Sequence, residues 1–150
     1  MVNVREATLN DLPAIMALFK RNNVPLNEDL RALFTVSNPN EECRLFVAEE
    51  DGQIVAFTRV HVHSWNRSAY MIELLVDAVS RRRGIGTLLL KTVEDFAREK
   101  GARVIMFDTA VDNFPALNLY LKRGFRICGY NDKLYESGKT AIYLAKELQP

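Results

Sequence analysis

One passage near the middle of the chain constrains the fold most, because it contains two strand patterns separated by a helix. Residues 69–77 are a mostly apolar run typical of a buried strand, and residues 103–109 are a second such run. Between them, apolar residues recur at helical spacing from Leu89 to Ala97, and Gly101 ends the pattern. Two strands joined in this way lie parallel, through a right-handed crossover. We therefore predict an α+β domain with a mixed sheet.

The rest of the chain predicts further strands and helices on both sides of this passage. We predict strands over residues 2–7, 44–50, 54–64, 125–130 and 140–148, and helices over residues 10–22, 24–34 and 114–123. Asp51 and Gly52 form a strong turn signal, which predicts a hairpin. Asn10 is expected to cap the first helix. Glu94 is expected to pair with Arg98 on the polar face of the middle helix.

The composition argues against several classes of protein. The 150 residues include 48% hydrophobic and 26% charged residues, a globular balance that predicts one domain over residues 1–150. The formal net charge of +1 argues against nucleic acid as a partner, since domains that coat nucleic acid carry a large basic excess. No apolar run reaches the roughly 18 residues of a membrane helix, and the first residues lack the pattern of a signal peptide. We expect a cytoplasmic protein with no membrane partner.

Neither the cysteines nor the histidines predict a metal site. Cys43 and Cys128 lack the CxxC spacing of zinc and redox motifs, and we expect both to be reduced and mostly buried. His61 and His63 alternate on one face of a strand, but no third ligand of matching geometry accompanies them. We therefore expect no metal, and we place the two histidines on a polar outer face or at the rim of an acceptor site.

A cluster of arginines meets a glycine hinge between the two central strand patterns. The glycines allow the backbone to turn tightly and to approach another molecule closely. The first N–H groups of the following helix would then point outward unpaired, where the helix dipole attracts anions. On spacing alone, a plain turn with solvated arginines stays open as an alternative. The pattern favours a pyrophosphate-binding loop formed by Arg81, Arg82, Arg83, Gly84, Ile85, Gly86 and Thr87.

Two motifs resemble the GCN5-related N-acetyltransferase (GNAT) superfamily. Residues 81–86 match the [Q/R]-x-x-G-x-[G/A] signature of its acetyl-CoA loop, and residues 113–125 match its N-x-x-A-x-x-L-Y-x-x-x-G-F segment. Residues 4–15 are similar to its first strand and helix, although Ala78 stands where many members have a proline. The resemblance implies a single-domain GNAT-like fold, with a mostly antiparallel sheet of about seven strands, a splayed fourth and fifth strand, and about four helices.

The resemblance also implies where acetyl-CoA would lie. In the family, the pantetheine arm lies between the splayed strands and bonds the backbone of the fourth, which here would involve Leu74, Leu75 and Val76. An N–H near Val76 would then stabilise the negative charge that grows on the thioester oxygen as an amine attacks. Asn113 is expected to cap a helix and to bond the pantetheine, and Ala116 belongs to the same coenzyme-binding segment.

Tyr120 is expected to be the general acid, because the departing thiolate needs a proton. Phenol and thiol pKa values of about 10 and 8.5 correspond to a gap of roughly 2 kcal/mol, which a site favouring the phenolate would narrow. The general base stays open between Glu73, Asp108, Tyr70 and a chain of waters. Glu73 is the only charged residue inside its apolar strand, and Asp108 ends the next strand near the same cleft. Tyr70 lies two pleats before Leu74.

The predicted function is transfer of an acetyl group from acetyl-CoA to a primary amine, by direct attack in a ternary complex. The acceptor stays open among a small amine or antibiotic, a protein N-terminus and a lysine side chain. Residues 20–34 and 130–139 are expected to hold it, and both segments carry acidic side chains. A non-catalytic acetyl-CoA-binding sensor domain is the alternative function. A homodimer is compatible with the sequence.

Overall fold

The strands form one sheet of seven strands in the order β1-β2-β3-β4-β5-β7-β6. The computed structural model describes residues 1–26 and 28–148. The strands are β1 (Val2–Glu6), β2 (Glu41–Glu50), β3 (Gln53–His63), β4 (Ser68–Val76), β5 (Val104–Ala110), β6 (Arg126–Asn131) and β7 (Ala141–Glu147). The helices are α1 (Leu12–Arg21), α2 (Ala32–Thr35), α3 (Ile85–Glu99) and α4 (Phe114–Lys122), with 3₁₀ turns at Leu9–Asp11 and Ala78–Ser80. The predicted α+β class and mixed sheet are confirmed.

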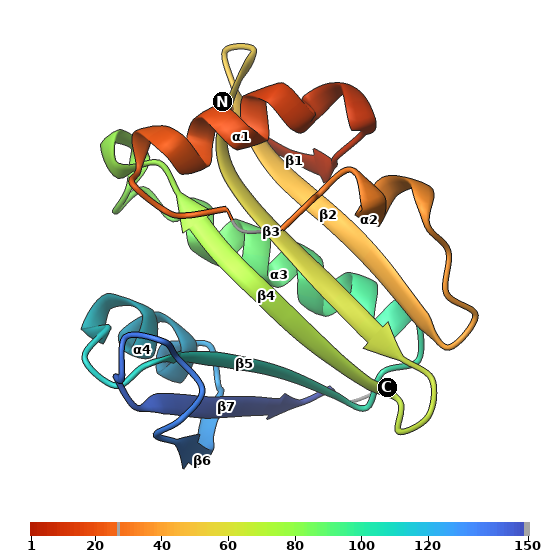
Figure 1. Cartoon of the computed structure of the whole chain (residues 1–150), viewed down its shortest axis with the longest axis vertical. Helices are drawn as coiled ribbons and strands as arrows, with labels where there is room; N and C mark the ends of the chain where they lie inside the picture. Colours follow the sequence, from red (N-terminus) through yellow and green to blue (C-terminus); the bar gives the residue numbers. More distant parts are fainter. Residues whose placement is uncertain (27, 149–150) are drawn as a thin grey trace.

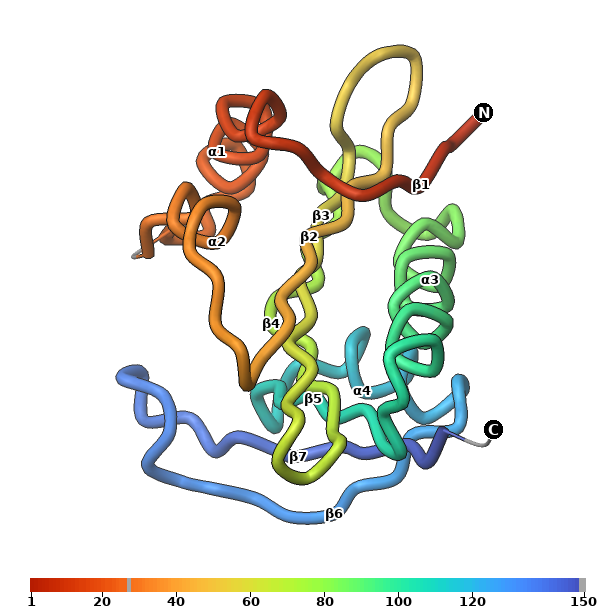
Figure 2. Tube along the Cα trace, turned by 90° about the vertical axis from the view of Figure 1, so that its right-hand side faces the viewer, coloured from red at the N-terminus to blue at the C-terminus, as the bar shows by residue number. Residues whose placement is uncertain are grey.

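Helices cover both faces of the sheet. Figures 1 and 2 show α1 and α2 on one face of β1 to β4 and α3 on the other, with α4 beside the second half of the sheet. On the α1 face, Phe19 packs edge to face on Phe57 of β3, with ring centroids 5.5 Å apart. On the α3 face, Leu89, Val93 and Ala97 are fully buried, as their spacing predicted. In the part of the chain described, no helix combines the length and the apolarity needed to cross a membrane.

The crossover from β4 through α3 to β5 is parallel, as predicted. Gly101 ends α3 with φ +81°, and the Ala102 N–H donates to the Ala97 carbonyl at 2.9 Å, the pattern of a Schellman cap. The two strands pair only from Ser68 to Tyr70 of β4. Beyond that point they diverge, and Figure 1 shows β5 leaving β4 to join β7 and β6. The splayed pair of strands is therefore confirmed.

A β-bulge interrupts β4 just beyond the parallel pairing. The register against β3 shifts between Thr58 and Arg59, and Glu73 is the extra residue, with φ +62°. Met71 and Leu74 both pack with the α3-side core, although three residues separate them. Because successive side chains of a strand point to opposite faces, Tyr70 lies on the face of the sheet opposite to Met71, which is the α1 side. The expectation that Tyr70 and Leu74 share a face was therefore wrong, because the bulge changes which side each later residue faces.

The predicted helix over residues 24–34 was also wrong in the part that the structure describes. Only Ala32–Thr35 is helical, and residue 27 lies outside the described residues. Pro25 disfavours a helical conformation for the residue before it. The Asp29 carboxylate accepts the Arg31 N–H at 3.0 Å, a local turn that competes with a helix. The apolar spacing in this segment instead reflects burial of Leu30 against α1.

Three smaller expectations need correction. The first helix is preceded by a capping box between Thr8 and Asp11, not by an Asn10 cap, because the acidic group three residues after Thr8 can bond its N–H, here at 2.7 Å. Cys128 is exposed, because the edge strand β6 is covered on neither face. Glu94 does lie near Arg98 but is only 2% exposed, because it turns toward β7 and accepts from Lys146 at 2.6 Å.

The Glu94 to Lys146 ion pair links α3 to the second half of the sheet, so breaking it should be costly. Lys146→Met should lower the free energy of unfolding by about 3 kcal/mol, because it leaves a buried carboxylate without its main partner. Adding Glu94→Leu to that variant should restore most of the loss. Urea denaturation measures both. A double variant no more stable than the single would contradict this role for the pair.

Candidate active site

The divergence of β4 and β5 leaves backbone groups of β4 facing a gap. The Asp77 N–H donates to Val55 of β3 at 2.8 Å, so alternation along the strand turns the backbone groups of Val76 and Leu74 away from β3. Those of Leu75 face β3. A Cβ added to Gly86 at the start of α3 would lie 3.7 Å from Val76 and 3.5 Å from Leu119 of α4. The gap is therefore bordered by β4, the start of α3 and α4.

The glycine hinge forms the turn that the sequence predicts. Gly84 has φ +81° and immediately precedes α3, a conformation that favours glycine. Among the described residues, no side chain caps this helix end. The first regular contact is the Leu88 N–H to the Gly84 carbonyl, at 3.0 Å. The N–H groups of the first turn are thus available to an anion.

Two of the three arginines are tethered to neighbouring strands. The Arg81 Nε donates to the Val76 carbonyl at 3.0 Å. Arg83 forms a two-pronged ion pair with Glu50 at the end of β2, with one contact of 2.8 Å. These bonds hold the loop against the sheet. To bind a pyrophosphate, Arg81 and Arg83 would have to release Val76 and Glu50. The pyrophosphate role of residues 81–87 stays a prediction.

Tyr120 lies on α4, the helix that borders the gap through Leu119. Its ring is fully buried and stacks on Phe107 of β5 with centroids 4.5 Å apart. Its hydroxyl is buried and has no hydrogen-bond partner among the described residues. Burial, and secondly the charge of Asp108, raise the pKa of Tyr120 well above 10.0. The site therefore keeps the phenol protonated. It does not narrow the difference between the pKa values of the phenol and the thiol.

The segment that carries Tyr120 is fixed at both ends. The Asn113 side chain accepts the Ala116 N–H at 3.4 Å, which confirms the predicted helix cap. Gly124 has φ +92°, and the Phe125 N–H donates to the Tyr120 carbonyl at 3.0 Å. These caps set the position of α4 beside β5. The predicted bond from Asn113 to pantetheine is a separate matter and stays a prediction, as does the coenzyme contact of Ala116.

Asp108 lies on the opposite side of the sheet from the Tyr120 ring, between two tyrosines. The Tyr70 hydroxyl donates to one carboxylate oxygen, and the Tyr135 hydroxyl donates to the other at 2.6 Å. Burial, followed by the bond to Asp108, raises the pKa of both phenols above the usual value. The structure thus brings together Tyr70 and Asp108, two of the predicted candidates. Tyr135 was missed, since its place in the loop after β6 gives no spacing signal.

Glu73 extends from the bulge on the same side as Asp108. Its backbone carbonyl accepts the Thr58 hydroxyl at 2.5 Å, which anchors the bulge to β3. The carboxyl reaches the surface, yet surrounding protein atoms raise its pKa by removing water, Asp108 raises it further, and Arg59 opposes both. Arg59 is buried and binds Glu28 through two hydrogen bonds of 2.8 Å. Sequence reasoning missed Arg59, because its partner lies 31 residues away.

The histidines lie on a polar part of the sheet. His61 contacts Glu41 through Nδ1, and its Nε2 is 3.8 Å from the Cys43 sulfur. The ring of His63 stacks beside it, with centroids 6.4 Å apart. Within the described residues, no group of three or more His, Cys, Asp or Glu side chains could hold a metal ion.

Comparison with known proteins identifies the family. Residues 12–125 match the acetyltransferase (GNAT) family. The chain belongs to the GNAT acetyltransferases. It is 33% identical over 109 residues to a streptothricin acetyltransferase of Streptomyces lavendulae, a match that covers 69% of this chain and 58% of that protein. It is 30% identical to an N-alpha-acetyltransferase of Sulfurisphaera tokodaii, over 97% of this chain and 92% of the other.

A solved structure shares the fold of this GNAT chain. A Bacillus anthracis protein assigned as a streptothricin acetyltransferase, solved in complex with acetyl coenzyme A, superimposes with a TM-score of 0.78. The two sequences are 23% identical, and the match covers 99% of each chain. The predicted family, fold class and enzyme class are therefore confirmed. Membership of the family places the acetyl donor among the expected ligands of the gap.

The electrostatics of the GNAT site can be tested without any ligand. The Glu73 carboxyl should titrate above its ordinary value of 4.5, because it is shielded from water. Arg59→Gln should raise the pKa of Glu73 further, and Asp108→Asn should lower it, since the two neighbours act with opposite sign. Carbon-detected NMR of the glutamate carboxyls against pH measures both shifts. Titration at or below 4.5 in the unmodified protein would contradict the assignment.

Proposed function

We propose that this chain transfers the acetyl group of acetyl-CoA to a primary amine by direct attack in a ternary complex. The observation that supports the proposal is that the elements around one gap carry three features suited to a thioester. These features are the free backbone edge of β4, the uncapped start of α3, and the buried hydroxyl of Tyr120. A thioester in this gap would have hydrogen-bond donors for its phosphates and its carbonyl, and an acid beside its sulfur.

The coenzyme would lie along the edge that β4 leaves open. Its pyrophosphate would bind the N–H groups from Gly84 to Thr87, with Arg82 and its neighbours adding positive charge. Its pantetheine arm would bond the outward backbone groups of Leu74 and the N–H of Val76, whose carbonyl already accepts from Arg81. In this arrangement the Val76 N–H faces the thioester oxygen and stabilises the charge that develops there.

The hydrogen-bond partners of the two carboxylates support Glu73, and not Asp108, as the general base. Both oxygens of Asp108 already accept tyrosine hydroxyls, whereas the Glu73 carboxyl accepts no hydrogen bond from the described residues. Water exclusion also makes Glu73 a stronger base than an ordinary glutamate. We assign Glu73 to take a proton from the ammonium, directly or through water, and Asp108 with Tyr70 to hold the amine in place.

The transfer then balances in three moves. Glu73 takes a proton from the ammonium, and the nitrogen lone pair forms a bond to the thioester carbon. The C–S bond breaks, and the departing sulfur takes the Tyr120 phenol proton. The nitrogen loses its second proton, which restores the Tyr120 phenol through water, and Glu73 releases the first proton to solvent. The products are therefore a neutral amide, a thiol and one proton. Because burial raises the pKa of the Tyr120 phenol, the phenol keeps its proton at physiological pH and can donate it in this step.

A non-catalytic acetyl-CoA sensor is the second function considered, and the relatives do not favour it, since they are named as acetyltransferases. The names of those relatives point to two kinds of acceptor, an antibiotic and an α-amine. A cytoplasmic location, the absence of nucleic-acid or membrane partners and a homodimer stay predictions, as does a single domain over residues 1–150.

Replacing Tyr120 tests the proposed chemistry. Tyr120→Phe keeps the ring and its packing on Phe107, so the fold and the affinity for acetyl-CoA should change little. The value of kcat should fall by about 10²- to 10⁴-fold, because the acid acts only as the thiolate departs. Thiol release from acetyl-CoA, in the presence of an amine that the enzyme acetylates, measures this loss in kcat. Calorimetry measures coenzyme binding.

A second acyl donor and a control variant sharpen this test. An acyl donor with a more acidic leaving thiol should rescue Tyr120→Phe more than the unmodified enzyme. Leu121→Ala is the control on the same helix, since Leu121 is 46% exposed, and it should leave kcat nearly unchanged. Unchanged kcat in Tyr120→Phe, where chemistry limits turnover, would remove the general-acid role.

A further inference from the structure

A continuous groove leads away from Glu73 along the α1 face. A cavity of about 360 Å³ includes Glu73, Ile72 and Arg59 in its lining. A second cavity of about 560 Å³ is lined by α1 and by residues 24, 26 and 28–30. The two cavities share lining residues, among them Phe19 and Leu26. Volumes in this range are typical of small-molecule sites. An amine held beside Glu73 would therefore have the rest of its molecule in this groove.

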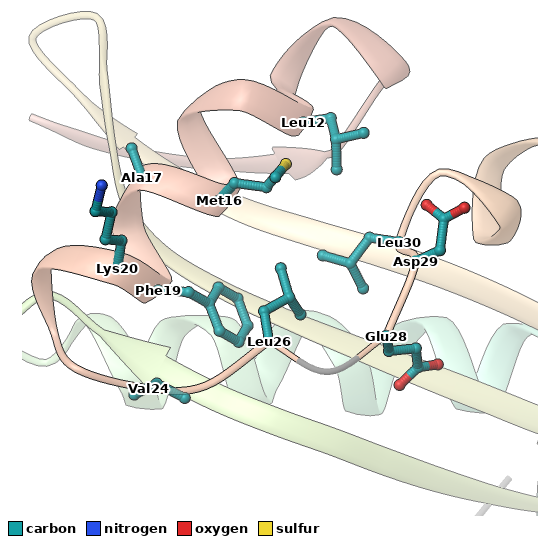
Figure 3. Close-up of a pocket in the computed structure, with 10 residues that line it drawn as sticks. All are labelled: Leu12, Met16, Ala17, Phe19, Lys20, Val24, Leu26, Glu28, Asp29 and Leu30. Atoms are coloured by element: carbon teal, nitrogen blue, oxygen red, sulfur yellow. The ribbon is translucent and has the colours of Figure 1, made fainter.

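The walls of the groove are mainly apolar. Figure 3 shows Phe19, Leu26 and Leu30 turned toward one another, with Met16 above them and Glu28 at one end. Met16 is 52% exposed, so its apolar surface is free to contact a ligand. An apolar side chain placed against Phe19, Leu26 and Leu30 would gain by burial, whereas the charged lining groups Lys20, Glu28 and Asp29 lie at the borders of this apolar wall.

Arg59 adds a positive charge to the inner end of the groove. The residue is only 7% exposed, and its two terminal nitrogens donate to Glu28. Its Nε–H is buried and has no partner among the described residues. A guanidinium has five N–H donors, so donors remain for an oxygen of a ligand. The same charge opposes a second cation placed close to the reacting amine.

We propose that the acceptor is the α-amine of an apolar amino-acid residue, whose carbonyl or carboxylate oxygen faces Arg59 and whose side chain packs against Phe19 and Leu26. This inference rests on the proposed acetyl transfer and specifies its acceptor. A free apolar amino acid and a peptide that begins with an apolar residue present the same chemistry at this site. An acceptor without an apolar group next to its amine would leave the wall of Phe19 and Leu26 unfilled.

Matched acceptors test each part of the proposal by thiol release from acetyl-CoA. Leucinamide should exceed glycinamide in kcat/KM by about 100-fold, the effect of filling an apolar pocket. Leu26→Ser should lower the ratio of kcat/KM for leucinamide to that for glycinamide by about 10-fold. Ile127→Ser on β6 is the matched control, since Ile127 is 57% exposed and far along the sheet order from the groove.

The role of Arg59 is tested with an amine that lacks the oxygen. The ratio of kcat/KM for leucinamide to that for 3-methylbutylamine should fall by about 10-fold in Arg59→Gln, since a hydrogen bond to a charged group is lost. Taking the ratio in each protein cancels the different pKa values of the two amines. Thermal unfolding checks that the variant is folded, and Leu26→Ser tests the groove independently of Arg59.

The acceptor arms separate the two proposals. If free leucine is acetylated faster than a leucyl peptide, the acceptor is an amino acid. If the leucyl peptide is acetylated faster, the acceptor is a peptide N-terminus. Turnover of streptothricin above leucinamide, with both groove variants neutral, would overturn this inference and leave acetyl transfer intact. Thiol release with none of these amines, despite acetyl-CoA binding, would overturn the proposed function itself.

Discussion

The β-bulge at Glu73 is the feature on which the rest of the site depends. It inserts one residue into β4 at a positive φ and is held by the Thr58 hydroxyl. Because the extra residue reverses the alternation, Tyr70 faces the α1 side while Leu74 packs toward α3. The strand also twists away from β5 within a few residues, and this divergence exposes the backbone of Val76. The bulge lies just beyond the last pair of β4 with β5, so the carboxyl of Glu73 and the start of the gap lie close together along the strand.

The sheet keeps the two proposed proton-transfer groups, Tyr120 and Glu73, in different surroundings. Tyr120 lies on the packed side, where its ring is enclosed by Phe107 and Phe125 and its phenol stays neutral. Glu73 and Asp108 lie on the side that opens toward α1 and the groove. Separation of this kind lets one group donate and another accept without neutralising each other directly. The acceptor and the coenzyme would then approach the gap from opposite sides.

Local sequence signals predicted well the local structure of the loop before α3, of α3 itself and of the start of α4. The Gly84 turn, the Asn113 cap and the burial of α3 each depend on residues close together in the chain, where spacing carries the information. The acceptor side was less predictable, because its pairs join distant segments. Arg59 with Glu28, and Tyr135 with Asp108, became visible only when the topology placed them together.

The segment after α1 shows the same limit. Its leucines recur at helical spacing, yet Pro25 and the Asp29 turn keep most of its described residues out of a helix. Burial against α1 produced a periodicity that resembles a helix. Glu94 is the converse case, since a pattern typical of a solvated helix face gave no sign that Lys146 lies opposite.

Amide hydrogen exchange with and without acetyl-CoA tests the central claim most directly. If the coenzyme binds along the open edge of β4, exchange should slow at the Val76 amide and at residues 85–87. The Leu75 amide faces β3 and should change little, so it serves as an internal reference. Slowed exchange at Leu75 and Val76 alike would indicate general stiffening of the strand. Binding of acetyl-CoA with no slowing at Val76 would contradict the account.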